Sequence, residues 1–288
     1  MKLQVLKPHE KDLGGGFMVR RLIPALDRRA IGPFVFFDHF GPIVERPEDR
    51  HDVRPHPHIG LATVTYLFEG AIDHRDSTGA VQRIEPGAIN LMAAGRGIVH
   101  SERRPPDMAD RAAPKHGLQL WMALPAENEQ DPPNFDHTPA HSIPVHEREG
   151  VTARVLIGSA HGLESPVPTL SPTLYVDYRL APGGCIELPD ATERLLYGVD
   201  GAFEVDGEPA QPCTGLVLPS GTVRLAAREG ARVVLIGGDS LGPRHIWWNF
   251  VATRKELILE AAQAWEAGGI GDVPGDPERM PLPDKRPH

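Results

Sequence analysis

Short apolar runs separated by turn-forming residues restrict the folds open to this chain more than any other feature. Its 288 residues include 30 glycines and 30 prolines, which are residues that end strands and form turns. Apolar runs such as 34–37 and 61–68 have the length of single strands. Closely spaced short strands are typical of antiparallel sandwiches and barrels. We therefore expect an all-β protein.

This pattern of short strands occurs twice, over residues 32–124 and again from residue 151 onward. The prolines of residues 131–144 donate no hydrogen bond to a sheet, so we interpret that stretch as a linker. A length of 288 residues also fits two medium domains. We predict two antiparallel, jelly-roll-like β-barrels in tandem, with domains at residues 1–144 and 145–288.

One short α-helix is expected near the C-terminus, over residues 253–267. Gly268 and Gly269 follow it, and glycine is the usual residue after a helix end. The tail from Asp272 to His288 is rich in proline and charge. Its composition leaves two alternatives open, a frayed end and a segment that lies over a domain surface.

Composition and charge exclude several classes of protein. The formal net charge is −9, whereas nucleic-acid binding needs a surface of clustered Lys and Arg. No apolar run approaches the roughly 18 residues of a membrane helix, and the start of the chain lacks the apolar core of a signal peptide. Cys185 and Cys213 are too few for a disulfide framework and are interpreted as structural thiols. We expect a cytoplasmic protein with no membrane contact and no direct nucleic-acid contact.

Histidines are the most informative residues, because eleven of the 14 lie within the first 146 positions. Two pairs stand out, His56 with His58 and His100 with Glu102. Residues at i and i+2 of a strand point to the same face. If the two segments meet inside one barrel, three imidazoles and one carboxylate converge there. That donor set suits a divalent transition metal such as iron, with two octahedral positions left for other ligands, whereas zinc more often closes into a tetrahedron.

Each pair alone is more readily explained as ordinary core or surface residues than as metal ligands. Together the pairs favour a metal site, because Gly95 and Gly97 before the second pair let the backbone come close to it. Such a metal would be functional, since a chain of this length buries enough surface to fold without one.

The segments around these pairs are similar to the pirin family of the cupin superfamily. The motifs that carry the resemblance read Arg54-Pro55-His56-Pro57-His58-Ile59-Gly60, Ala94-Gly95-Arg96-Gly97-Ile98-Val99-His100-Ser101-Glu102, Gly117-Leu118-Gln119-Leu120-Trp121 and Trp247-Trp248-Asn249-Phe250-Val251. The resemblance implies a bicupin, two β-barrels of which the N-terminal one alone holds a metal, usually iron. It also implies the metal ligands His56, His58, His100 and Glu102.

We expect one metal per chain. No histidine lies between His161 and His245, so the second barrel lacks a comparable donor set. In cupins generally the carboxylate ligand follows the histidine pair by four or five positions, where this chain has Ala62 and Thr63, and the carboxylate has moved to Glu102. Iron(II) is the expected ion. Nickel, copper, manganese and zinc are alternatives, since nitrogen and oxygen ligands accept most first-row divalent ions.

Some members of the family are similar to quercetinases, which open the heterocyclic ring of a flavonol with dioxygen and release carbon monoxide. The resemblance therefore implies a small, flavonol-like aromatic substrate and O2. Glu102 is expected to act in turn as metal ligand and as the catalytic base for the flavonol hydroxyl. His39, Gln119 and Trp121 are candidates for the substrate pocket. The alternatives are that His39 and Asp38 cap a turn and that Trp121 packs in the core.

Two other functions stay open at this point. Some pirins resemble redox-responsive partners of transcription factors, so the main alternative is a non-enzymatic, iron-dependent regulatory protein. An acidic chain would bind a basic protein partner sooner than DNA. A third alternative is a scaffold whose metal serves stability alone. His74-Arg75-Asp76 is interpreted as a surface turn, and a monomer is expected because pirin relatives are often monomers.

Overall fold

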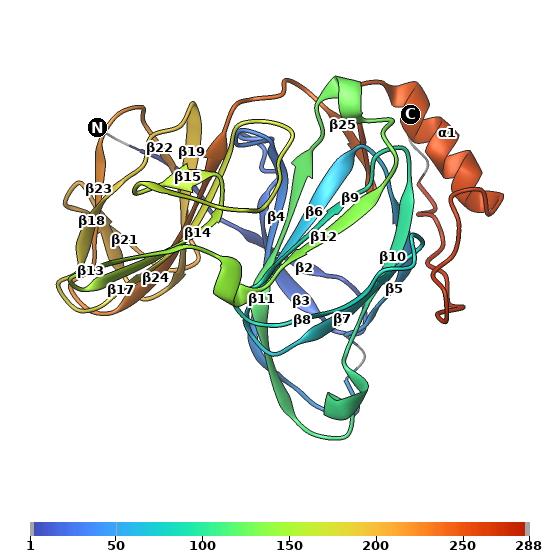
Figure 1. Cartoon of the computed structure of the whole chain (residues 1–288), viewed down its shortest axis with the longest axis horizontal. Helices are drawn as coiled ribbons and strands as arrows, with labels where there is room; N and C mark the ends of the chain where they lie inside the picture. The colour runs from blue at the N-terminus through green and yellow to red at the C-terminus, as the bar shows by residue number, and fades with distance from the viewer. Residues whose placement is uncertain (1–2, 50, 286–288) are drawn as a thin grey trace. The chain divides into compact units, whose positions relative to one another are not determined.

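The computed structural model describes residues 3–49 and 51–285, and nearly all of their regular structure is β-strand (Figure 1). The strands form two seven-stranded and two four-stranded sheets, besides two small strand pairs. Within these four sheets, the strand pairs with a defined register are antiparallel. The all-β expectation is confirmed. None of the helices in the described ranges is long and apolar enough to cross a membrane.

The chain divides into two compact units, each made of separate stretches. One consists of Met1–Glu10, Arg20–Asp38 and His141–Ser240 and is called here the 141–240 unit. The other consists of Lys11–Val19, His39–Ala140 and Leu241–His288 and is called the 39–140 unit. The domain boundary between residues 144 and 145 stays a prediction. The two compact units are each built from three stretches that alternate along the sequence.

Two sheets form the barrel of the 39–140 unit. The smaller sheet contains, in spatial order, β5 (Val53–His58), β10 (Ile98–Arg103), β7 (Ile72–Asp76) and β8 (Val81–Ile84). The larger sheet contains, in spatial order, β12 (Asn134–Thr138), β9 (Ile89–Ala93), β6 (Leu61–Glu69), β11 (Ala113–Ala123), β4 (Phe34–Glu45), β3 (Met18–Ile23) and β2 (His9–Asp12). The boundary between the two units falls within β2, within β3 and between Asp38 and His39 of β4.

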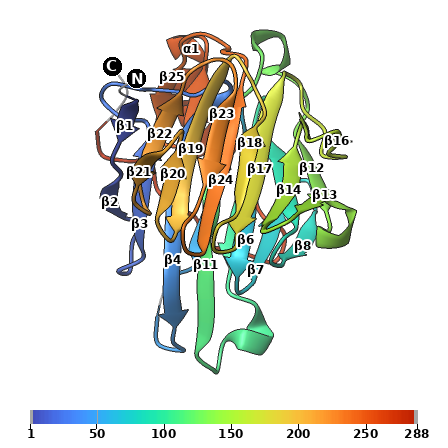
Figure 2. The same ribbon diagram turned by 90° about the vertical axis from the view of Figure 1, so that its left-hand side faces the viewer.

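The 141–240 unit contains a second pair of sheets (Figure 2). The larger one contains, in spatial order, β1 (Gln4–Leu6), β22 (Gly215–Leu218), β19 (Glu193–Asp200), β24 (Ala231–Gly238), β17 (Thr173–Leu180), β14 (Val151–Ile157) and β13 (Val145–Arg148). The smaller one contains β18 (Cys185–Leu188), β23 (Val223–Ala226), β20 (Phe203–Val205) and β21 (Glu208–Ala210). The core of the 141–240 unit includes Val176, Leu196 and Leu235, which are fully buried.

Short elements complete the chain. They are the 3-10 helices η1 (Pro106–Met108), η2 (Ala126–Asn128) and η3 (Ala140–Ser142), and the small strand pairs β15 (Ser159–Ala160) with β16 (Leu163–Glu164) and β25 (His245–Trp247) with β26 (Phe250–Ala252). Cys185 and Cys213 are free and partly buried.

Helix α1 (Lys255–Glu266) lies within the predicted range 253–267 and differs from it by one or two residues at each end, which is the usual uncertainty of helix ends. Its buried residues recur at helical spacing, Ile258, Ala261, Ala262 and Trp265, and they pack against Ile59, Val99 and Phe250 of the same unit. The helix therefore covers the barrel of the 39–140 unit, as the red end of the ribbon shows in Figure 1.

The tail after α1 also lies against this barrel. The amide of Met280 donates a hydrogen bond of 2.8 Å to the carbonyl of Pro55 on strand β5. The indole of Trp265 in turn donates to the carbonyl of Met280. Of the two alternatives left open for the tail, the described residues follow the second, a segment over a domain surface.

Candidate metal centre

Two neighbouring strands carry the predicted histidines. Strand β5 carries His56 and His58, and strand β10 carries His100, which lies directly opposite His56 in the antiparallel register. The spacing of two residues puts both β5 side chains on one face, and the register puts His100 beside them. The alternation within β5 and the register of β5 with β10 therefore assemble the three imidazoles together.

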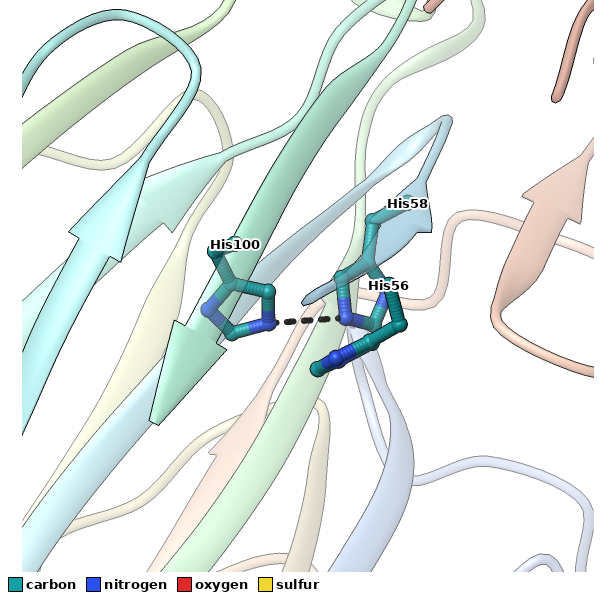
Figure 3. Close-up of side chains that lie close together, drawn as sticks. All are labelled: His56, His58 and His100. Atoms are coloured by element: carbon teal, nitrogen blue, oxygen red, sulfur yellow. Dashed lines mark hydrogen bonds between the residues drawn. The ribbon is translucent and has the colours of Figure 1, made fainter. Parts of the chain in front are cut away.

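The three rings converge in the interior of the barrel (Figure 3). One nitrogen from each ring lies within 4.8 Å of the others. Nε2 of His58 and Nε2 of His100 are 3.1 Å apart, and the ring of His56 is centred 4.4 Å from that of His100. All three side chains are buried.

Backbone carbonyls fix the direction of two of these rings. Nδ1 of His56 lies 2.8 Å from the carbonyl of Arg54, and Nδ1 of His58 lies 3.0 Å from the carbonyl of Asn249. A carbonyl only accepts, so Nδ1 carries the hydrogen in both rings and Nε2 is left as the free ligand atom. Backbone and side-chain partners on the far ring nitrogen are a common feature of metal-binding histidines.

The electrostatics of the cluster fit a bound cation. Burial lowers the pKa of His56 to about 4 and holds the pKa values of His58 and His100 well below their usual value. The rings are therefore neutral near pH 7 and present nitrogen lone pairs. Two metal–nitrogen bonds of about 2.1 Å that meet at a right angle separate their nitrogens by about 3.0 Å, which matches the 3.1 Å between His58 and His100. The three histidines fit a divalent transition metal.

Glu102 lies on the same strand, but its carboxylate is outside the cluster of atoms that lie within 4.8 Å of one another. The pairing of β10 with β5 shifts register between His100 and Glu102. Oε1 of Glu102 is 3.4 Å from the hydroxyl of Thr65. Burial raises the pKa of the Glu102 carboxyl, with His74 and Lys115 acting in the opposite direction. Its role as fourth ligand stays a prediction.

Two of the three predicted pocket residues lie on strand β11, Trp121 beside His58 and Gln119 within reach of a hydroxyl that faces Glu102. The ring of Trp121 meets the ring of His58 edge-on at a centroid distance of 5.2 Å, and Trp121 is 7% exposed. Oε1 of Gln119 accepts a hydrogen bond of 2.9 Å from the Thr65 hydroxyl, which also faces Glu102. Trp121 thus lies against His58, while Gln119 and Thr65 lie on the side of Glu102, and a contact with substrate stays a prediction.

The third predicted pocket residue, His39, lies in a different setting. Its Nε2 is 2.8 Å from Nε2 of His116, the two rings stack, and the edge of Phe68 lies nearby. The alternative that His39 and Asp38 cap a turn is wrong, because both residues lie within strand β4. Asp38 instead forms a two-pronged ion pair with Arg21.

The interpretation of His74-Arg75-Asp76 as a surface turn is also wrong. These residues end strand β7, and His74 and Asp76 are 3% and 0% exposed. Nδ1 of His74 lies 3.4 Å from Nδ1 of His100. The signal that could have identified them is the same i, i+2 spacing that identified the ligands, because it places His74 and Asp76 on one face of a strand. The Asn249 carbonyl left no such signal, since every residue has one.

Comparison with known proteins extends across both units. The family model described as Pirin matches residues 16–122, and the model described as Pirin C-terminal cupin domain matches residues 175–271. A pirin-like protein of Caulobacter vibrioides is 43% identical over 286 residues, which cover 97% of this chain and 95% of the relative.

Two further relatives have names that refer to an activity. A protein of Pseudomonas aeruginosa provisionally named quercetin 2,3-dioxygenase is 40% identical over 271 residues, which cover 92% of this chain and 84% of the relative. The crystal structure of quercetin 2,3-dioxygenase from Acinetobacter baumannii superposes with a TM-score of 0.89 and 34% identity, covering 99% of this chain and 97% of that one.

Proposed function

This chain belongs to the pirin family of bicupins, and from that premise we propose that it is a metal-dependent dioxygenase of quercetinase type. It would open the heterocyclic ring of a flavonol-like substrate with O2. The observation that carries the proposal is the convergence of three neutral, buried imidazoles beside Trp121. The relatives named quercetin 2,3-dioxygenase support the reaction class.

The proposed metal site takes one ion per chain. Its ligands are His56, His58 and His100, with Glu102 as the carboxylate that follows on the same strand. Iron(II) is the proposed ion, and nickel, copper, manganese or zinc would bind the same nitrogen and oxygen donors. A bound divalent ion supplies a Lewis acid, which lowers the pKa of a coordinated hydroxyl group.

Glu102 is the proposed base for the 3-hydroxyl proton of the flavonol. Burial raises the pKa of its carboxyl, and a base whose pKa lies closer to the working pH transfers protons more effectively. The Thr65 hydroxyl lies 3.4 Å from Oε1 of Glu102, and it also holds Gln119 at 2.9 Å. This hydroxyl has one hydrogen, so it can stabilise the charged carboxylate when it turns from Gln119 to Glu102, and it can accept a hydrogen bond from the carboxyl once Glu102 has taken the proton.

The proposed substrate contacts follow from the residues beside His58 and on the side of Glu102. Trp121 offers a flat apolar surface to an aromatic ring, and the Gln119 amide offers hydrogen bonds to its hydroxyl groups. His39 is the weaker candidate, because its ring contacts are His116 and Phe68. The proposed setting is a cytoplasmic monomer that acts on small molecules, with a basic protein partner as the alternative.

Metal content and turnover, measured on the same samples, test this proposal. Wild-type protein, His56→Ala and Glu102→Gln are analysed for metals by mass spectrometry, and flavonol depletion and carbon monoxide release are followed with each. We expect about one metal per wild-type chain with turnover, loss of both in His56→Ala, and retained metal with at least tenfold slower turnover in Glu102→Gln.

Other results would point elsewhere. Metal without turnover in the wild type would contradict the dioxygenase and favour the regulatory protein, whose partners should then differ between ferrous and ferric protein in a pull-down. Metal that only raises the melting temperature, with neither turnover nor a partner that depends on its oxidation state, would indicate a purely stabilising role.

A further inference from the structure

We infer that Asp76 and His74 form a relay that fixes the ring orientation and tautomer of His100, and so act as positioning residues for the metal centre. The inference rests on the proposed function insofar as it needs a metal on the three histidines. Neither residue was expected to contact the site from the sequence.

The register of the small sheet brings these residues together. Strand β10 lies between β5 and β7, and on its β7 side His100 is directly opposite Asp76 while Glu102 is directly opposite His74. His74 therefore reaches diagonally toward His100. Nδ1 of His100 is 3.4 Å from Nδ1 of His74, and Nε2 of His74 is 2.9 Å from Oδ2 of Asp76.

When His100 binds a metal through Nε2, the hydrogens along the hydrogen-bonded series His100–His74–Asp76 can be placed in only one way. Nδ1 of His100 must then carry a hydrogen and needs an acceptor, which is Nδ1 of His74. His74 can accept there only if its own hydrogen is on Nε2, and that hydrogen points at Asp76. An ionised carboxylate only accepts, so Asp76 selects this tautomer of His74 and, through it, that of His100.

Both members of the relay are themselves held in place. The ring of His74 stacks on the ring of Phe135, with centroids 4.4 Å apart and planes inclined by 17°. Oδ1 of Asp76 accepts from the amide and hydroxyl of Thr78 at 2.8 and 2.6 Å and from the amide of Ala80 at 3.3 Å. These bonds leave Oδ2 directed at His74. Burial raises the pKa of the Asp76 carboxyl, but the hydrogen bonds from His74 and Thr78 hold it below its usual value.

The other two ligands provide an internal comparison. His56 and His58 are oriented by backbone carbonyls, which no substitution of a side chain removes. His100 has side chains in that place. The orientation of this one ligand can therefore be changed by mutation without altering a metal ligand.

Asp76→Asn is the direct test. The oxygen of the new amide can still accept from Thr78, and its NH2 group would then face Nε2 of His74. Nε2 of His74 must accept from this group, so the hydrogen of His74 moves to Nδ1. There it opposes the hydrogen on Nδ1 of His100. We expect the affinity for Ni(II), measured by competition with a chelator, to fall by about ten- to 100-fold. Nitrogen NMR of the metal-loaded protein made with labelled histidine should report an altered His100 ring in this variant.

Variants of the neighbouring residues separate orientation from packing. His74→Gln keeps one acceptor and one donor and should retain most of the affinity, whereas His74→Leu removes both and should lose it. Thr78→Val removes a hydrogen bond to the same carboxylate but leaves its Oδ2 facing His74, and should bind Ni(II) within about threefold of wild type.

The possible failures can be told apart because no flavonol is used. If the wild type binds Ni(II) and Asp76→Asn binds it equally well, the relay is refuted and the dioxygenase proposal stands. If the affinity falls equally in Asp76→Asn and Thr78→Val, in step with their melting temperatures, the role of Asp76 is structural and the relay is again refuted. If the wild type takes up no metal, both proposals fail.

Discussion

At the scale of single residues, the hydrogen on each imidazole decides what the histidines can bind. The carbonyls of Arg54 and Asn249 hold the hydrogens of His56 and His58 on Nδ1. Both rings therefore present Nε2 to the interior in the folded protein, before any ion arrives. A ligand atom that is oriented in advance loses little conformational entropy on binding, which favours high metal affinity.

The metal-free protein is expected to lose stability as the pH falls from about 6.5 toward 4. Burial lowers the pKa of His56 to about 4 in the folded state, whereas a histidine of the unfolded chain titrates near 6.5. The unfolded state thus binds more protons in this window. For each histidine that is protonated in the unfolded state and neutral in the folded state, the free energy of unfolding falls by about 1.4 kcal/mol for each unit by which the pH is lowered. Urea denaturation at several pH values measures this slope.

His56→Gln is the control for that slope. It should remove one histidine's share of the pH dependence, and Glu102, whose raised pKa acts in the opposite direction, contributes equally to both proteins. Equal slopes in the metal-free wild type and variant would contradict a neutral, buried His56.

Trp121 is expected to support the metal centre through packing. Its ring is buried and meets His58 edge-on, so Trp121→Ala should cost about 3–5 kcal/mol of stability and weaken metal binding. Trp121→Phe keeps an aromatic edge and should lose less of both. Denaturation curves and metal competition on the two variants check this, and an Ala variant as stable as wild type would place Trp121 outside the core.

At the scale of elements, the C-terminal tail is tied to the strands that carry the ligands. The guanidinium of Arg103, which follows Glu102 on β10, makes two hydrogen bonds of 2.7 and 2.9 Å to Asp276. The amide of Met280 pairs with Pro55, the residue before His56. Both strands of the site thus have a partner in the last part of the chain.

Asp276→Asn is expected to loosen this attachment. The Asp276 side chain is 8% exposed, and its charge-assisted bonds to Arg103 should contribute about 1.5–3 kcal/mol each at most. We expect lower stability and faster amide exchange over residues 276–282 and in β5. Glu278→Gln is the matched control, because Glu278 contacts the same Arg103 from a side chain that is 54% exposed, and exposed pairs contribute little. Equal effects of the two substitutions would contradict a specific role for Asp276.

At the scale of the whole molecule, the three converging histidines of the described residues lie in one compact unit. When the free metal concentration is about 1,000 times the Kd, metal binding stabilises the folded protein by about 4 kcal/mol, and removing the metal takes that stabilisation away. We expect chelation to speed amide exchange in β5 and β10 and to leave β17 and β24 of the 141–240 unit unchanged. Equal acceleration in both units, measured by mass spectrometry, would contradict a single local site.

Local periodicity explains how much of this could be predicted from the sequence. Strand alternation depends only on neighbouring residues, so the all-β class and the pairing of His56 with His58 follow from it. Helix α1 is also predictable, from glycines at its end. The meeting of these residues with His100 was inferred from the donor set and the family resemblance, and the register of β5 with β10 accounts for it.

Other features depend on contacts between residues far apart in the chain. The pairing of β1 with β22 leaves no local pattern, and neither does the hydrogen bond between His58 and the backbone of Asn249, 191 residues later. The sequence around His74 and Asp76 indicates an exposed loop, because charged residues stand there beside a glycine-containing turn, whereas their burial depends on the pairing of β7 with β10. Hydrogen bonds that follow from register cannot be predicted before the register is known.

The distance in sequence between His58 and Asn249 has a consequence for biosynthesis. On the ribosome, Asn249 is added 191 residues after His58, so a chain that ends before Asn249 lacks the carbonyl that orients His58. We expect such a fragment to bind metal at the proposed site more weakly than a polypeptide that includes Asn249.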